Sequence, residues 1–570
     1  MVDMRGHMKT LQDCLREEKI EVDEAIIATI ASMDIEHKAG QLFMLAFGGD
    51  DPKRACRMIE NHYLGGCYIS DANASTPEKA ALLSSALQRC AISSSGIPLL
   101  LGVDQEGAWG VMMSASTTGP GNLGLGATHD PGLTWAMYGV IGEELEAVGY
   151  NTLLAPCADV NSNPANPIIG MRSFGGDAAE VARHVKAAVH GASETGVITT
   201  VKHFPGHGNT SEDSHRGIPR VDRDMKTLFE VDLAPFAAGI QAGVDIVMTS
   251  HILYSAIDPA MPATLSRPVI TGLLRGQMGF KGVVLSDSMN MRAMRRSYEP
   301  GRAATLALAA GVDMIMLAEE HYDHDAEKYE IVQRATIQGV IDAVKEGYLE
   351  ESAVDMAVYR ILKLKKRHGL LGRQNFILKP ETVGSQAHRA VEEAVCSRTI
   401  CVMRNSNECW PILPDSSVAL VRVVPASAYA ILTSTRGIGP NQEVSAFDTF
   451  RESFLRIHAT TRVIDFYGER NSMPVDLSIL EKFDVILAVT EDYPLPGVDF
   501  DTASQKRAVL RPSGKFGHKL AVVGLRTPYE LAEYPKVKAY VCSCSSRPCA
   551  AKAAAYALLG IVEAVGISPV

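Results

Sequence analysis

The run VITTVKHF, residues 197 to 204, is typical of a short, largely apolar strand, and it carries two polar side chains, Lys202 and His203, near its end. Seven similar runs flank it, separated by longer amphipathic stretches. They are GQLFMLAF (40–47), LGGCYIS (64–70), PLLLGVD (98–104), TLLAPCADV (152–160), DIVMTSHI (245–252), KGVVLSD (281–287) and DMIMLA (313–318). Most are apolar on both faces, as parallel strands covered by helices are. Eight such units predict a (β/α)₈ barrel, with an open doubly wound sheet as the alternative.

A second, smaller domain follows the barrel. After about residue 375 five further apolar runs, from SVALVRVV (417–424) to VKAYVCS (537–543), alternate with helix-like stretches and predict an α/β sandwich. We therefore expect a helical extension at 1–34, a catalytic barrel at 35–375, a linker at 376–395 and the sandwich at 396–570.

Composition narrows the class of protein. Hydrophobic residues make up 46% and charged residues 21%, and no apolar run reaches the roughly 18 residues that a membrane span needs. The start of the chain is charged and lacks the pattern of a secretory signal, and the 11 cysteines show no metal-finger spacing, so we expect a cytoplasmic protein. A net charge of -11 argues against nucleic acid as a partner. The sequence does not indicate the oligomeric state, and we make no prediction of it.

The stretch VKHFPGHGNTSEDSHRGIP, residues 201 to 219, carries the chemistry. It leaves a strand for a polar loop with three histidines, and such loops commonly hold functional groups. Asp213 and His215 lie two residues apart, so the carboxylate can orient the ring for proton transfer. A zinc site built from His203, His207, Asp213 and His215 is the alternative, although the spacing matches no strong ligand pattern.

The same stretch resembles the loop of the β-N-acetylglucosaminidase branch of the family 3 glycoside hydrolases, which reads KHFPGHGxTxxDSHxxxP. Further matches follow in family order: EHKAGQLFMLAFGG, LGVDQEG, IIGMRSFGGD and KGVVLSDSMNM. The second domain matches more loosely, through LAVVGLRTPYEL and GISPV.

The resemblance implies a retaining glycosidase that acts on a small carbohydrate and needs no metal or organic cofactor. It places the nucleophile on Asp287 and the acid/base pair on His215 and Asp213. It places sugar ligands on Asp104, Arg172, Lys202 and His203. Because the proton-transfer histidine comes from a barrel loop, we expect the second domain to be dispensable for that step.

One departure bears on the substrate. The family pattern DxEGGxVxR reads DQEGAWGVM here, so Met112 stands where an arginine is expected. Trp109 is either a stacking face for the sugar or a buried structural residue. We expect an exo-acting β-N-acetylhexosaminidase for muropeptides or chitin-derived oligosaccharides. The alternatives are a family 3 β-glucosidase, a glycoside phosphorylase and a non-catalytic sugar-binding relative.

Overall fold

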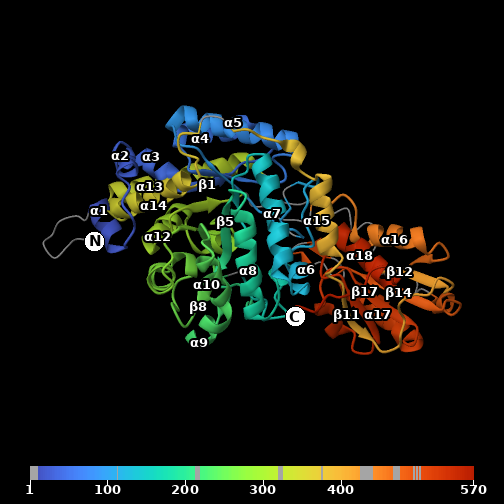
Figure 1. Cartoon of the computed structure of the whole chain (residues 1–570). Helices are drawn as coiled ribbons and strands as arrows, with labels where there is room; N and C mark the ends of the chain where they lie inside the picture. Colours follow the sequence, from blue (N-terminus) through green and yellow to red (C-terminus); the bar gives the residue numbers. More distant parts are fainter. Residues whose placement is uncertain are drawn as a thin grey trace.

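The structure, a computed structural model, describes most of the chain in two layered domains (Figure 1). The described residues are 10–108, 110–111, 113–211, 218–318, 325–373, 376–423, 441–466, 476–491, 494–495, 498–499 and 502–570.

Eight parallel strands form the first domain, in the order β10-β1-β2-β3-β4-β5-β7-β9. A parallel bridge between Leu285 and Met314 brings β9 and β10 together and closes the ring. The strands are β1 (Phe43–Ala46), β2 (Gly66–Ile69), β3 (Leu100–Val103), β4 (Thr152–Leu153), β5 (Ile198–Phe204), β7 (Ile246–Thr249), β9 (Val283–Leu285) and β10 (Ile315–Leu317). Every strand is buried along its length. The predicted (β/α)₈ barrel is confirmed.

Helices cover the outside of this barrel, and four of them begin with proline in the first turn behind a capping side chain. Asp51, Thr76, Asp130 and Glu299 accept backbone N–H bonds there, so proline costs no helical hydrogen bond. The outer helices are α3 (Ile35–Gln41), α4 (Pro52–His62), α5 (Pro77–Ser95), α6 (Asn122–Ala127), α7 (Pro131–Ala147), α8 (Ala178–Ser193), α9 (Met225–Thr227), α10 (Ala234–Gln241), η4 (Pro268–Gln277), α11 (Arg292–Ser297), α12 (Pro300–Ala310), α13 (Ala326–Lys345) and α14 (Glu351–Arg367).

Two short helices at the start of the chain, α1 (Leu11–Glu17) and α2 (Glu24–Ala31), pack against α14. Arg360 of α14 pairs with Glu18, and the Tyr359 hydroxyl accepts a bond of 2.8 Å from the Asp23 backbone N–H. These bonds fix the extension on the barrel.

The second domain is built on a six-stranded sheet in the order β11-β18-β17-β14-β12-β13. All neighbours are parallel except β11 and β18. The strands are β11 (Cys401–Asn405), β12 (Val418–Arg422), β13 (Arg462–Asp465), β14 (Val485–Thr490), β17 (Leu520–Gly524) and β18 (Ala539–Cys542). One face packs on α17 (Thr502–Phe516), the other on α16 (Ala446–Ile457) and α18 (Pro548–Leu558). The predicted sandwich is confirmed, and β11 is an edge strand that the sequence pattern did not indicate.

The two domains meet along α15 (Gln386–Cys396) and again at the end of the chain, which lies between them in Figure 1. Glu392 of α15 accepts the backbone N–H groups of Thr118 and Gly119 at 3.2 and 3.0 Å. A hydrophobic cluster continues from the barrel residues Ala108 and Leu123 into the second sheet. The domain boundaries predicted from the sequence, between residues 34 and 35, 375 and 376, and 395 and 396, remain a proposal.

A disulfide joins Cys56 of α4 to Cys90 of α5 across 34 residues. The scattered cysteine spacing gave no sign of this pair. Among the described residues, no helix combines the length and the apolar character that crossing a membrane requires.

Candidate active site

The predicted site residues in the described part of the chain lie at one face of the barrel. Asp104 follows β3, Lys202 and His203 lie in β5, and Asp287 follows β9. Arg172 ends a short helical turn, η1 (Gly170–Arg172), in the segment after β4. Because all these strands are parallel, their carboxyl ends converge on one face, and residues far apart in sequence meet there.

Lys202 is the centre of a buried ion-pair network. Its ammonium group lies 2.5 Å from Asp104 Oδ1 and 2.6 Å from Glu106 Oε1, and its side chain is 2% exposed. Burial lowers the pKa of Lys202, but these two carboxylates outweigh burial and hold the pKa above its ordinary value. The Tyr68 hydroxyl donates to the other Asp104 oxygen at 2.9 Å. The network thus fixes the Asp104 carboxylate from two sides.

Arg172 binds the same glutamate through a bidentate pair. Its Nε and Nη2 atoms lie 2.9 Å from the two Glu106 oxygens, and Nη2 also lies 3.2 Å from His203 Nε2. Burial would raise the pKa of Glu106, but Arg172 and Lys202 outweigh it and hold the pKa well below its ordinary range. Glu106 is therefore ionised and locks two cations in place.

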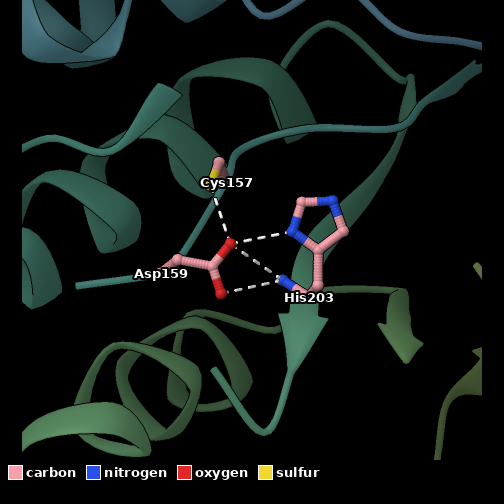
Figure 2. A group of neighbouring side chains, drawn as sticks. All are labelled: Cys157, Asp159 and His203. Atoms are coloured by element: carbon pink, nitrogen blue, oxygen red, sulfur yellow. Dashed lines mark hydrogen bonds and ion pairs between the residues drawn. The ribbon is translucent and has the colours of Figure 1, made fainter. Parts of the chain in front are cut away.

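A second buried carboxylate, Asp159, orients His203 (Figure 2). Asp159 Oδ2 lies 2.8 Å from His203 Nδ1 and accepts the Cys157 thiol at 3.0 Å. Its Oδ1 accepts the backbone N–H groups of His203 and His207 at 3.2 and 2.6 Å. Burial would raise the pKa of Asp159, and His203 and His207 bring it below its ordinary value. The carboxylate fixes which edge of the His203 ring faces Arg172.

The ligand atoms of Cys157, Asp159 and His203 lie within 4.8 Å of one another, a spacing at which they could bind one metal ion. Burial and the neighbouring Asp159 raise the pKa of the Cys157 thiol well above its ordinary value, whereas a metal ligand must be a thiolate. Both Asp159 oxygens already accept hydrogen bonds. The donor set fits a hydrogen-bonded cluster better than a metal site.

Asp287 follows β9 and is partly exposed. Burial would raise the pKa of Asp287, but His203, His251, the Ser288 N–H and Lys202 lower it below its ordinary value. The Ser288 N–H bond measures 2.7 Å. His251 is itself held by Thr264 at 2.9 Å and by the Ser288 carbonyl at 3.0 Å. This environment keeps the Asp287 carboxylate ionised.

Asp213 and His215 lie outside the described residues, as do Trp109 and Met112. The near end of their loop is described, and it is held by the segment after β4. Asn166 Nδ2 donates to the His207 carbonyl at 2.8 Å and to Thr210 Oγ1 at 3.2 Å. Beyond the loop, β6 (Arg220–Val221) pairs with β8 (Leu253–Tyr254).

The structure thus joins Asp104, Lys202, Arg172 and His203 into one bonded network and places Asp287 within its electrostatic influence. Sequence reasoning missed Glu106, the hub of that network, although it stands two residues after Asp104 at the same strand end. Asp159 and His251 were not among the predicted site residues either.

Comparisons with known proteins identify the family of the chain. The sequence model described as "Glycosyl hydrolase family 3 N terminal domain" matches residues 34–364. A solved glycoside hydrolase family 3 β-N-acetylglucosaminidase from Paenibacillus sp. str. FPU-7 shares 31% identity with a TM-score of 0.82, covering 94% of this chain and 99% of that one.

Curated relatives extend the similarity to the second domain. β-Hexosaminidase A of Pseudoalteromonas piscicida is 27% identical over 85% of this chain and 83% of its own length. A β-N-acetylglucosaminidase/β-glucosidase of Cellulomonas fimi is 26% identical over 95% of this chain and 94% of its own. The predicted resemblance is confirmed, and the chain belongs to glycosyl hydrolase family 3 and is a glycosidase.

Proposed function

We propose that the protein is a retaining, exo-acting β-N-acetylhexosaminidase that removes terminal N-acetylglucosamine-type sugars. The observation that carries this proposal is the Asp287 carboxylate, which is partly exposed after a barrel strand and has its pKa lowered by two neighbouring histidines, the Ser288 N–H and Lys202. A retaining glycosidase needs an ionised nucleophile in such a position. The names of the Paenibacillus, Pseudoalteromonas and Cellulomonas relatives support the choice of sugar.

In this proposal Asp287 attacks the anomeric carbon while His215 protonates the departing oxygen. His215, now neutral, then takes a proton from the water that releases the sugar from Asp287. Asp213 orients the ring and stabilises its charged form. A histidine suits both steps because its ordinary pKa lies near neutral pH.

The bonded network would bind the sugar hydroxyls. Asp104 and Lys202 are held by each other, and Arg172 uses Nε and Nη2 for Glu106 and His203. Among the described residues nothing bonds to Arg172 Nη1, which leaves this donor for a hydroxyl. Groups that are fixed before the substrate arrives lose little entropy on binding it.

We further propose muropeptides or chitin-derived oligosaccharides in the cytoplasm as the source of the substrate. The Cys56–Cys90 disulfide speaks against the cytoplasm, because disulfides are more typical of an oxidising compartment. Fractionation of the native protein with an antibody decides the compartment, since recovery outside the cytoplasm overturns that part of the proposal.

Asp287→Ala and His215→Ala test the mechanism on an aryl β-N-acetylglucosaminide. We expect Asp287→Ala to lose about 10³-fold or more in kcat. His215→Ala should lose about 10²-fold or more on glycosides with poor leaving groups and less on activated ones, because only poor leaving groups need the proton. Asp342→Ala, on the solvent face of α13, is the matched control. Near-normal hydrolysis by either site variant contradicts the assignment.

A panel of aryl glycosides with and without phosphate defines the activity. The Cellulomonas relative favours β-glucosides as a second substrate class. Faster turnover of the β-glucoside than of the β-N-acetylglucosaminide would overturn the choice of sugar. Release of a sugar 1-phosphate would show that the reaction is phosphorolysis and not hydrolysis. Inactivity on the whole panel would indicate that the protein binds sugars without cleaving them.

A further inference from the structure

The segment from Asn161 to Gly176 connects β4 to α8 and carries Arg172. The barrel holds its inner side. Asn122 Nδ2 donates to the Arg172 carbonyl at 2.7 Å, and Ser173 Oγ donates to the Asp159 carbonyl at 2.6 Å. With strands on one side only, a segment of this length would keep freedom on its outer side.

The second domain bonds to that outer side at three places. At the start of the segment, Asn161 Nδ2 donates to the Tyr529 hydroxyl at 2.5 Å. In the middle, Arg526 Nε donates to the Met171 sulfur at 3.1 Å, next to Arg172. At the end, the Gly176 N–H donates to the carbonyl of residue 569 at 2.9 Å. The contacts therefore span the whole segment.

The same segment supports the loop that leads to Asp213 and His215. Besides the bonds from Asn166, the Asn163 N–H donates to the Gly208 carbonyl at 3.2 Å. The two backbones are so close that a Cβ on Gly208 would lie 1.7 Å from the Val160 carbonyl oxygen. A displacement of the segment would thus reach both Arg172 and the acid/base loop.

We infer that the second domain positions the Arg172 segment for catalysis, with Tyr529 and Arg526 as positioning residues. The inference rests on the proposed function for its effect on turnover, and on geometry alone for its effect on the segment. It revises the expectation that this domain is dispensable for the proton-transfer step, because the acid/base loop is braced by a segment that the second domain holds.

Tyr529→Phe removes one hydroxyl and keeps the ring, so the fold is retained. Tyr556→Phe is the control, because Tyr556 lies in α18 of the second domain, where its ring packs against Lys552. Amide hydrogen exchange should speed up at residues 161–176 in Tyr529→Phe and stay unchanged there in Tyr556→Phe. Equal exchange of this segment in wild type and Tyr529→Phe overturns the inference, whether or not the protein hydrolyses any glycoside.

A double-mutant cycle with Arg172→Met tests the catalytic consequence. Losing one hydrogen bond of about 1 kcal/mol predicts a roughly fivefold fall in kcat/KM for Tyr529→Phe. In the Arg172→Met background the same change should have a smaller effect, because its route through Arg172 is gone. If the fold-loss in kcat/KM of the double variant equals the product of the two single fold-losses, Tyr529 has a merely structural role and its positioning of Arg172 is overturned. Wild-type inactivity, with the exchange difference intact, would instead reject the proposed function.

Discussion

Replacing Glu106 by glutamine should destabilise the barrel more than any exposed carboxylate change. Glu106 is 3% exposed and accepts three charge-assisted bonds, at 2.6 Å from Lys202 and at 2.9 Å twice from Arg172. The amide keeps one acceptor, turns an NH₂ group toward a cation and leaves two buried cations with less negative charge. Breaking such a buried pair costs roughly 3 kcal/mol. In a domain of this size we expect the Tm to fall by about 6 °C at pH 7.

The stabilisation that Glu106 contributes should decrease at acidic pH. The pKa of Glu106 lies below its ordinary value of 4.5 in the folded protein, so its stabilisation is fully present above pH 4.5 and is lost as the pH falls through the folded pKa. The difference in Tm between wild type and Glu106→Gln should stay constant from pH 7 to about pH 5 and narrow below about pH 4.5.

Differential scanning calorimetry across this range measures both quantities. Glu393→Gln is the control, because its pair with Lys552 at 2.8 Å is exposed and should shift the Tm by less than about 1 °C. If Glu106→Gln unfolds within 1 °C of that control at pH 7, or if the gap persists unchanged on acidification, the ion-pair reasoning is refuted.

Three further outcomes follow from the site and the cysteines. Asp159→Asn should lower kcat/KM about tenfold or more, because an amide NH₂ would face the donors around Asp159 and turn the His203 ring. An unchanged kcat/KM in steady-state kinetics would contradict this. Thiol titration in denaturant without reductant, on protein purified under oxidising conditions, should find 9 reactive thiols, and a count of 11 would exclude the Cys56–Cys90 bond. Dialysis against EDTA should leave kcat/KM within about twofold, whereas a loss of activity that zinc restores would show that the enzyme depends on a metal ion.

The barrel was predictable because most of its strands are apolar on both faces and several are followed by polar residues. VITTVKHF (197–204) corresponds almost residue for residue to β5, and KGVVLSD (281–287) contains the shorter β9. The edge strand β11, Cys401–Asn405, was missed for a physical reason: its residues after Cys401 are half-exposed or exposed, so no buried pattern marks them.

The strand-end residues of the site were predictable, but their connections were not. Glu106 pairs with Arg172 and Lys202, which lie 66 and 96 residues away, and only the closed barrel brings them together. Asp104 was identified through its motif, whereas Glu106 gained importance through partners that local spacing does not reveal. The same holds for Tyr529, whose partner Asn161 belongs to the other domain.

The return of the chain to the barrel has a mechanical consequence. The second domain is anchored through α15, where Glu392 binds residues 118 and 119, and again where the Ile567 N–H donates to the Ala127 carbonyl at 2.9 Å. Together with the contacts of Tyr529 and Arg526 to the segment after β4, these bonds attach the second domain to the barrel at several separated places. Rigid-body rotation of the second domain is therefore restricted, and we expect sugar entry and product release to depend on the loops at the barrel mouth.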